Sequence, residues 1–147
     1  MRMIRLAIRE DLKGVLALYK ELRPHDVELE AHFAKAKWGE LLDDPSMLLV
    51  VAERDGELAS TCALGLNRSI ANGARPFGII EHVVTSQNFR KQGLSRKVLE
   101  YALKLAWQHD CAKVMVLSGE ALTSAHRVYE SVGFKGGIEK GFVIKPA

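Results

Sequence analysis

The chain contains few of the residues on which several protein classes depend. Only 2 of its 147 residues are cysteine and only 4 are proline. Cys62 and Cys111 lie in apolar stretches without metal-ligand spacing, so we expect buried free thiols and neither a disulfide framework nor a metal site. No apolar run approaches the roughly 20 residues that cross a bilayer, and the first residues do not form a signal-peptide core. These absences predict a cytoplasmic protein that does not act on a membrane.

Charge is also limited in amount. The formal net charge is +3, and no basic run is interleaved with aromatic residues. This excess is too small to argue for a nucleic-acid partner, although it suits an anionic cofactor. The length and a hydrophobic content of 48% fit one domain spanning residues 1–147 that buries its own core.

Hydrophobic periodicity predicts a mixed α/β order of elements. An Asp-Gly pair at 55–56 indicates a hairpin turn between two strands. Residues 67–76 read as a long loop. We expect strands at 3–8, 47–53, 57–66, 78–85, 113–117 and 142–145, and helices at 10–22, 29–42 and 94–108, with a short one from 123 or 124 to about 133.

The most informative segment is 80–95, which reads as a buried strand, a short turn and the start of a helix. Backbone N–H groups in the first turn of a helix are free, and the helix dipole there favours negative charge. Gly93 lets a ligand approach the backbone, and Ser95 keeps the turn small. Arg90 and Lys91 add positive charge, and arginine can hold a phosphate through two parallel hydrogen bonds. The segment has neither the P-loop nor the G-x-G-x-x-G pattern, yet it predicts a pyrophosphate site.

A second pattern lies in the short helix near the carboxyl end. Ala125 and Tyr129, followed by Gly133 and Phe134, have the spacing A-x-x-x-Y-x-x-x-G-F. Together with the run RKQGLS at 90–95, this pattern resembles the GNAT superfamily of N-acetyltransferases, whose first motif is R/Q-x-x-G-x-G/A. The chain departs from the family at two positions, Ser95 and Leu122, the second of which is Asn in many members.

The resemblance implies an α/β fold with a mixed, mostly antiparallel sheet of about six or seven strands and about four helices. It also implies acetyl-CoA as cosubstrate, with the pantetheine arm lying along the central strand like an added strand. The backbone N–H of Val83 would then stabilise the oxyanion. The cofactor-binding residues implied in this way are Val83, Val84, Thr85, Arg90, Lys91, Gln92, Gly93, Leu94, Ser95 and Ala125.

Acetyl transfer to an amine requires a base, because an alkyl amine with a pKa of about 10 is mostly protonated at neutral pH. Glu81 is a carboxylate in an apolar strand, which is costly without a partner or a task. It is either the catalytic base or a structural carboxylate that pairs with a neighbouring arginine or caps a loop. His82 is the alternative base and, by strand alternation, points to the opposite face. Tyr129 resembles the family's general acid at the sulfur, or else it is a core aromatic residue.

The leading hypothesis is an enzyme that acetylates a primary amine of a small molecule by direct attack within a ternary complex. The alternatives are a protein or peptide N-acetyltransferase and a non-catalytic acyl-CoA-binding module. His126 either contacts the cofactor or acceptor, or is a solvated helix position. The strand at 142–145 could close its own sheet or pair with a second copy in a homodimer. Candidate acceptor-side residues are His25, Asp26, Glu28, Glu30, His32, Trp38, Arg68, Asn72, Arg75 and Phe77.

Overall fold

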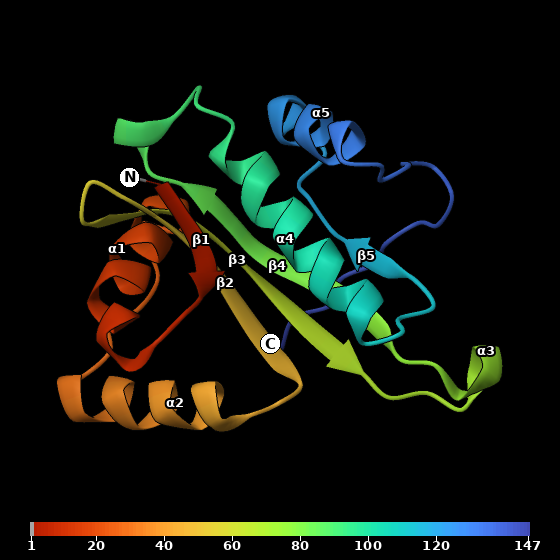
Figure 1. Ribbon diagram of the computed structural model, residues 1–147, viewed down its shortest axis with the longest axis horizontal. Coiled ribbons are helices and arrows are strands. Elements are labelled where there is room, and N and C mark those ends of the chain that lie inside the picture. The colour runs from red at the N-terminus through yellow and green to blue at the C-terminus, as the bar shows by residue number, and fades with distance from the viewer. Residues whose placement is uncertain (1) are drawn as a thin grey trace.

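The computed structural model describes residues 2–147 and consists of one sheet with helices on both faces (Figure 1). The sheet has five strands in the order of the sequence, antiparallel except for the parallel pair β4–β5. The strands are β1 (Arg2–Leu6), β2 (Met47–Arg54), β3 (Glu57–Asn67), β4 (Phe77–Thr85) and β5 (Val114–Val116). The helices are α1 (Leu12–Leu22), α2 (Ala31–Asp43), α3 (Ala71–Ala74), α4 (Leu94–Gln108) and α5 (Thr123–Ser131), with 3₁₀ turns at Arg9–Asp11 and Gln87–Phe89.

Helix α4 covers one face of the sheet because its apolar residues recur at helical spacing. Leu94, Val98, Leu99, Ala102 and Ala106 are all buried against residues of β2, β3 and β4. Each fully buried leucine or valine side chain contributes about 1.5–3 kcal/mol. Helix α5 packs beside α4 on this face, as Figure 1 shows.

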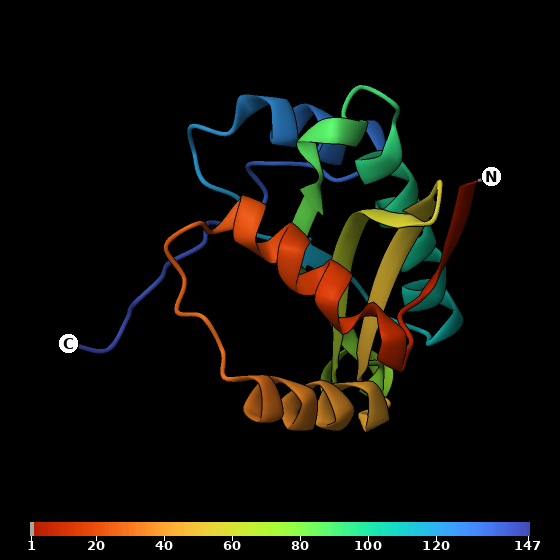
Figure 2. The ribbon, with the colours of Figure 1, turned by 90° about the vertical axis from the view of Figure 1, so that its left-hand side faces the viewer.

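Helices α1 and α2 cover the other face, which Figure 2 shows from the side. A second cluster of buried side chains joins Val15 of α1 and Trp38 of α2 to Leu49, Val51 and Ala63 of the sheet. The sheet is therefore buried on both faces at its centre, where β2 and β3 run as nearly continuous apolar strands. The hairpin between them turns at Asp55 and Gly56, which both have positive φ, as the Asp-Gly signal predicted.

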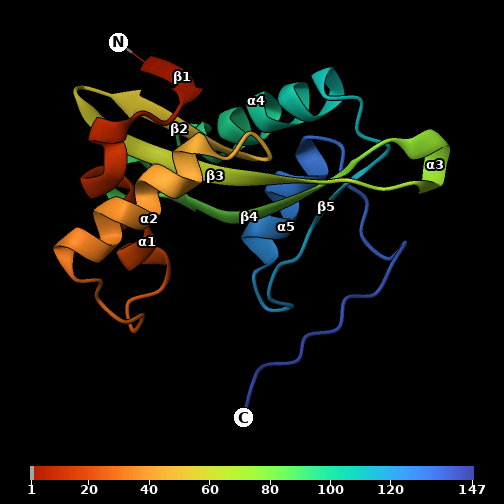
Figure 3. The ribbon, with the colours of Figure 1, turned by 90° about the horizontal axis from the view of Figure 1, so that it is seen from below.

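The expectations of six or seven strands and about four helices were wrong in two places. Residues 142–145 form no strand, and Phe142, Val143 and Ile144 are 74–96% exposed. A strand needs a hydrogen-bonding neighbour, and the carboxyl-terminal segment leads away from the molecule (Figures 2 and 3). The extra helix is α3, a single turn inside the expected loop, where Asn72 and Gly73 adopt left-handed backbone angles.

Among residues 2–147, no helix combines the length and apolar character needed to cross a membrane. Within the same range, no group of three or more histidine, cysteine or acidic side chains is placed to hold a metal ion.

Candidate active site

Strand β4 is interrupted by a β-bulge at its centre. Glu81 pairs with Ala63 and Val84 pairs with Thr61, so His82 and Val83 together oppose the single residue Cys62 of β3. His82 has a φ of +54°, which is rare for a residue other than glycine. A bulge bends its strand and re-aims the side chains beside it.

The bulge places Glu81 and His82 on the same face of the sheet. Ala63, the partner of Glu81, belongs to the cluster under α1 and α2, and paired residues share a face. The His82 ring packs against Tyr19 of α1, with 5.2 Å between ring centroids. We predicted opposite faces for Glu81 and His82 from strand alternation, and this was wrong because the extra residue breaks the alternation. Both side chains are exposed.

Strands β4 and β5 separate directly before the bulge. They pair only from Gly78 with Val114 to Ile80 with Val116, whereas β4 continues to Thr85. The edge of β4 from Glu81 to Thr85 therefore has no strand beside it on the β5 side. Free N–H and C=O groups on such an edge can pair with an extended ligand, as in β-strand addition.

At the end of β4 the chain turns into α4 through two residues with left-handed backbone angles, Lys91 (φ 63°) and Gly93 (φ 74°). The N–H of Lys97 donates to the Gly93 carbonyl at 3.1 Å, so the N–H groups ahead of it in the first helical turn have no intrahelical acceptor. A Cβ atom built on Gly93 would meet no other atom within 4 Å. The turn is therefore open to a ligand.

The side chains of the run 90–95 differ in their partners. Arg90 and Lys91 are exposed, and Arg90 makes one long hydrogen bond, from Nε to the Thr85 carbonyl at 3.4 Å. The Gln92 side chain instead accepts a hydrogen bond from Arg54 at the end of β2. The side chains of Arg90 and Lys91 are therefore available to bind an anion, whereas that of Gln92 is already hydrogen-bonded.

A chain of hydroxyl groups joins the sheet to the start of α4. Ser60 Oγ lies 2.8 Å from Thr85 Oγ1, which lies 2.5 Å from Ser95 Oγ. Ser60 Oγ also donates to the Val84 carbonyl at 3.0 Å. The serine at position 95, where the family motif has glycine or alanine, therefore has a partner of its own and fixes the turn to β4.

Tyr129 lies on α5 with its ring half-buried against the cluster under α4. The ring of Phe134 meets it edge-on at 6.1 Å, and the N–H of Phe134 donates to the Tyr129 carbonyl at 3.1 Å. Burial is the main cause that raises the pKa of Tyr129, the hydroxyl of Ser118 lowers it, and Cys62 raises it. The Ser118 Oγ itself is buried without a hydrogen bond of normal geometry in the free protein.

Both cysteines are buried free thiols, as predicted. Cys62 lies opposite the bulge, and burial raises its pKa to about 12. Its Sγ approaches the Val98 carbonyl at 3.5 Å. Burial and, to a lesser extent, Cys62 raise the pKa of Tyr19 to about 12 and also raise the pKa of Tyr129.

Comparisons with protein families and with solved structures both identify acetyltransferases. A family model described as "Acetyltransferase (GNAT) family" matches residues 5–134. The chain belongs to the GNAT acetyltransferase family. A putative acetyltransferase from Agrobacterium tumefaciens has a TM-score of 0.92 and 35% identity, with 98% of this chain and 99% of that chain covered. No curated protein sequence gave a match.

More distant acetyltransferases share the fold. Glucosamine-6-phosphate N-acetyltransferase from Arabidopsis thaliana has a TM-score of 0.85 and 19% identity, with 100% of this chain and 98% of that chain covered. An aminoglycoside N-acetyltransferase solved in complex with CoA has a TM-score of 0.82 and 18% identity, with 100% of this chain and 96% of that chain covered. The resemblance drawn from the two motifs is confirmed by the family match.

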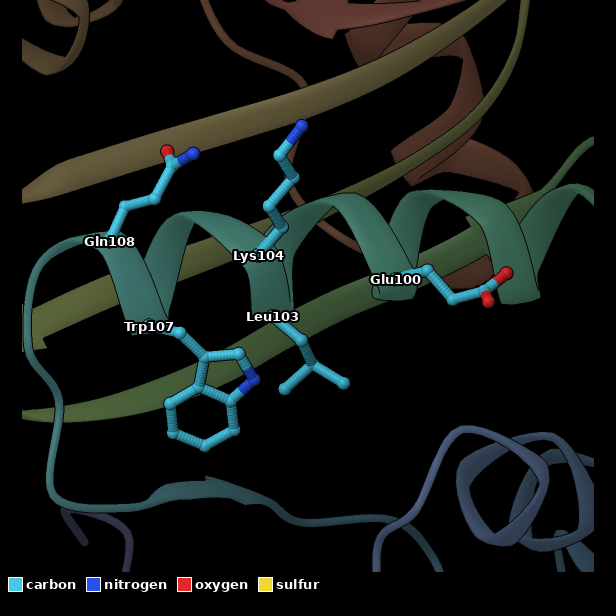
Figure 4. Close-up of a pocket in the computed structure, with 5 residues that line it drawn as sticks. All are labelled: Glu100, Leu103, Lys104, Trp107 and Gln108. Atoms are coloured by element: carbon cyan, nitrogen blue, oxygen red, sulfur yellow. The ribbon is translucent and has the colours of Figure 1, made fainter.

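One open hollow in this GNAT acetyltransferase lies away from these elements. It has a volume of about 530 Å³ and is lined by Glu100, Leu103, Lys104, Trp107 and Gln108, all on the outer side of α4 (Figure 4). A ligand site normally encloses its ligand with several elements, whereas this hollow is bounded by one helix. We therefore place the candidate site at the β4 bulge and the turn into α4.

The predicted cofactor residues fall into two groups in the structure. Val83, Val84 and Thr85 lie on the free edge of β4, and the run from Arg90 to Ser95 forms the turn. Ala125 lies apart from both in sequence, one turn before Tyr129 on α5. Leu122 precedes α5, is 54% exposed and makes no side-chain cap. The roles of these residues stay predictions.

Most of the charged candidates on the acceptor side already have partners. Glu28 pairs with Lys20 at 3.0 Å, Asp26 pairs with Arg23 at 3.0 Å, and Glu30 caps α2. These contacts show that the charge pattern of this region serves local structure in the free protein.

Three contributors to the site were missed from the sequence. Tyr19 lies within the helix predicted at 10–22 but belongs to no motif, and neither does Ser60 or Ser118. Their contacts join segments far apart in the chain, so no local pattern could have indicated them.

Proposed function

We propose that this protein is an acetyl-CoA-dependent N-acetyltransferase that acetylates a primary amine of a small molecule. The observation that carries this proposal is the free edge of β4, which begins at the bulge and ends at the open turn into α4. An extended thioester arm fits such an edge, and a pyrophosphate fits the turn. Two fold relatives are a glucosamine-6-phosphate N-acetyltransferase and an aminoglycoside N-acetyltransferase, which supports an amine acceptor.

In this proposal the chain binds acetyl-CoA through backbone groups and two cations. Val83, Val84 and Thr85 pair with the pantetheine arm, and the N–H of Val83 stabilises the oxyanion that forms as the amine adds. The first-turn N–H groups of α4 hold the pyrophosphate, assisted by Arg90 and Lys91.

Glu81 is the base that takes the proton from the amine. Its side chain is exposed on the α1–α2 side, and the described residues offer it no hydrogen bond or ion pair. This unpaired state supports the role of a base over that of a structural carboxylate paired with an arginine. His82 is less suited to the role, because its ring is held against Tyr19.

Tyr129 is the acid that protonates the departing thiolate. Its raised pKa keeps the phenol protonated at neutral pH, as an acid must be. Direct attack is favoured over a covalent acyl-enzyme on Cys62, because a buried thiol with a pKa of about 12 is a poor nucleophile.

The experiment that tests this function measures release of CoA thiol from acetyl-CoA in the presence of amines. The panel should contain polyamines, amino sugars, aminoglycosides, amino acids and peptides, so that peptide acceptors compete directly with small molecules. We expect turnover with a small-molecule amine and a loss of about 10²- to 10⁴-fold in Tyr129→Phe. Tyr101→Phe on α4 is the matched control and should keep full activity.

Turnover with peptides alone would assign the protein to the second function class. Binding of acetyl-CoA without turnover on any amine would favour a non-catalytic acyl-CoA module. A cytoplasmic location and a homodimer stay predictions from the sequence.

A further inference from the structure

Ser118 carries a buried hydroxyl group that lacks a hydrogen-bond partner. It follows β5 by two positions, and its Oγ is buried without a hydrogen bond, the one such side-chain atom among residues 2–147. A buried hydroxyl without a partner costs free energy, so an unpaired one in a native fold calls for an explanation.

The segment that carries Ser118 is tied to α5. His126 Nε2 lies 2.9 Å from the carbonyl oxygen of Gly119, the residue after Ser118. A carbonyl only accepts, so Nε2 must carry a proton and donate. The N–H of Leu122 donates to the same carbonyl at 3.0 Å. These two bonds fix the backbone beside Ser118 to a point on α5 one turn before Tyr129.

The Tyr129 ring is fixed as well. Phe134 holds it edge-on, and the ring packs against the cluster under α4. The hydroxyl of Ser118 is close enough to lower the pKa of Tyr129, although the two groups are not in hydrogen-bonding geometry in the free protein. The titratable group that faces Tyr129 from the sheet is Cys62, a neutral thiol.

We propose that Ser118 is a positioning residue for Tyr129: a rotation of its side chain brings its O–H into line with the tyrosine oxygen, to which it then donates, and so directs the tyrosine O–H toward the sulfur of the bound thioester. When the phenolic oxygen of Tyr129 accepts a hydrogen bond from Ser118, its own O–H must point in another direction, so the contact with Ser118 fixes the direction of the phenolic proton. The inference rests on the proposed function and assigns a role that no motif carries.

The proton balance makes the contact useful. When the C–S bond breaks, the electron pair goes to sulfur, and Tyr129 transfers its proton there to give the CoA thiol and a tyrosinate. The Ser118 O–H then donates to the tyrosinate oxygen, and water returns the proton. A thiol has a pKa of about 8.5, below that of tyrosine, and burial increases this pKa difference by raising the pKa of Tyr129. A hydrogen bond from Ser118 to the tyrosinate lowers the pKa of Tyr129 and so reduces the difference.

The test is a titration of Tyr129 that does not depend on turnover. The chain has three tyrosines, so ¹³C labels at the ring Cζ give few signals, and Tyr129→Phe assigns the relevant one. We expect Ser118→Ala to raise the titration midpoint of Tyr129 by about 0.5–1 pH unit, because a hydrogen bond to the charged form is lost. Ser118→Thr keeps a hydroxyl and should restore the midpoint, and Ser124→Ala, at an exposed position of α5, should not change it.

Activity adds a second readout on the same variants. The basic limb of the pH profile of kcat should move with the Tyr129 midpoint in Ser118→Ala, with acetyl-CoA affinity unchanged. A midpoint that stays in place would overturn the inference, even if activity fell, because the fall would then reflect packing alone. A shifted midpoint in a protein that acetylates nothing would support the contact and refute the proposed function.

Discussion

Replacing Gly93 by alanine tests the turn at the start of α4 in two separate ways. Gly93 has a φ of 74°, and a Cβ atom there would meet no atom within 4 Å. The substitution therefore causes no clash within the protein and imposes only a left-handed backbone on an L-residue. That conformation costs about 1–2 kcal/mol, which lowers the melting temperature of a protein of this size by about 2–8 °C.

Gly73 provides a matched control at the other end of β4. It has a φ of 72° and equally open surroundings, so Gly73→Ala should lower stability by the same amount. The two variants should differ only in ligand binding. If the backbone at Gly93 holds a phosphate, the added methyl group removes a charge-assisted hydrogen bond of about 1.5–3 kcal/mol and weakens acetyl-CoA binding roughly 10- to 100-fold.

Thermal unfolding and calorimetric titration with acetyl-CoA measure the two effects on the same samples. Equal affinities in the two variants would refute the placement of the phosphate at this turn. A much larger loss of stability in Gly93→Ala than in Gly73→Ala would refute the backbone argument itself.

Three further predictions concern other parts of the molecule. Burial alone would raise the pKa of Asp11, but hydrogen bonds from Arg5 and from a backbone N–H more than offset this effect, so the pKa of Asp11 is lowered in the folded protein. The ionised Asp11 therefore stabilises the folded state above about pH 4, the pKa of an aspartate in the unfolded chain, and this stabilisation is lost as the pH falls below that value. Arg5→Ala should lower the free energy of unfolding by about 2 kcal/mol at pH 7, less than for a fully buried ion pair because the Arg5 side chain is 21% exposed. In urea unfolding measured at several pH values, the variant should also lose less stability than the unmodified protein as the pH falls. Glu81→Gln should lower kcat by about 10²- to 10⁴-fold with acetyl-CoA affinity unchanged; a larger loss in His82→Ala would assign the base to His82. Ile144→Lys should convert a homodimer to a monomer in light scattering, and an unchanged mass would exclude this segment as the contact.

Elements with a strong local pattern were predictable from the sequence. The helix expected at 94–108 is α4, Leu94–Gln108, because five small or aliphatic residues recur on one face. The hairpin at Asp55 and Gly56 follows from the backbone angles that this pair favours. In these cases the interactions that define the element lie within one or two turns of chain.

The features that the sequence did not reveal depend on contacts between distant segments. The bulge at His82 arises from the register between β3 and β4 and has no glycine to mark it. The hydroxyl chain from Ser60 to Ser95 spans three elements. Residues 142–145 have strand-forming side chains but no neighbouring strand in the chain that they could pair with, so propensity alone misled the prediction.

Acetyl-CoA binding at the turn is the central claim, and calorimetry with acetyl-CoA and CoA tests it most directly. The double variant Arg90→Ala, Lys91→Ala removes two exposed cations, and Lys13→Ala, Lys35→Ala removes the same charge elsewhere on the surface. At about 1 kcal/mol for each exposed contact, we expect the first variant to bind about 30-fold more weakly than the second. Equal binding by the two variants, or no binding by the intact protein, would contradict the account.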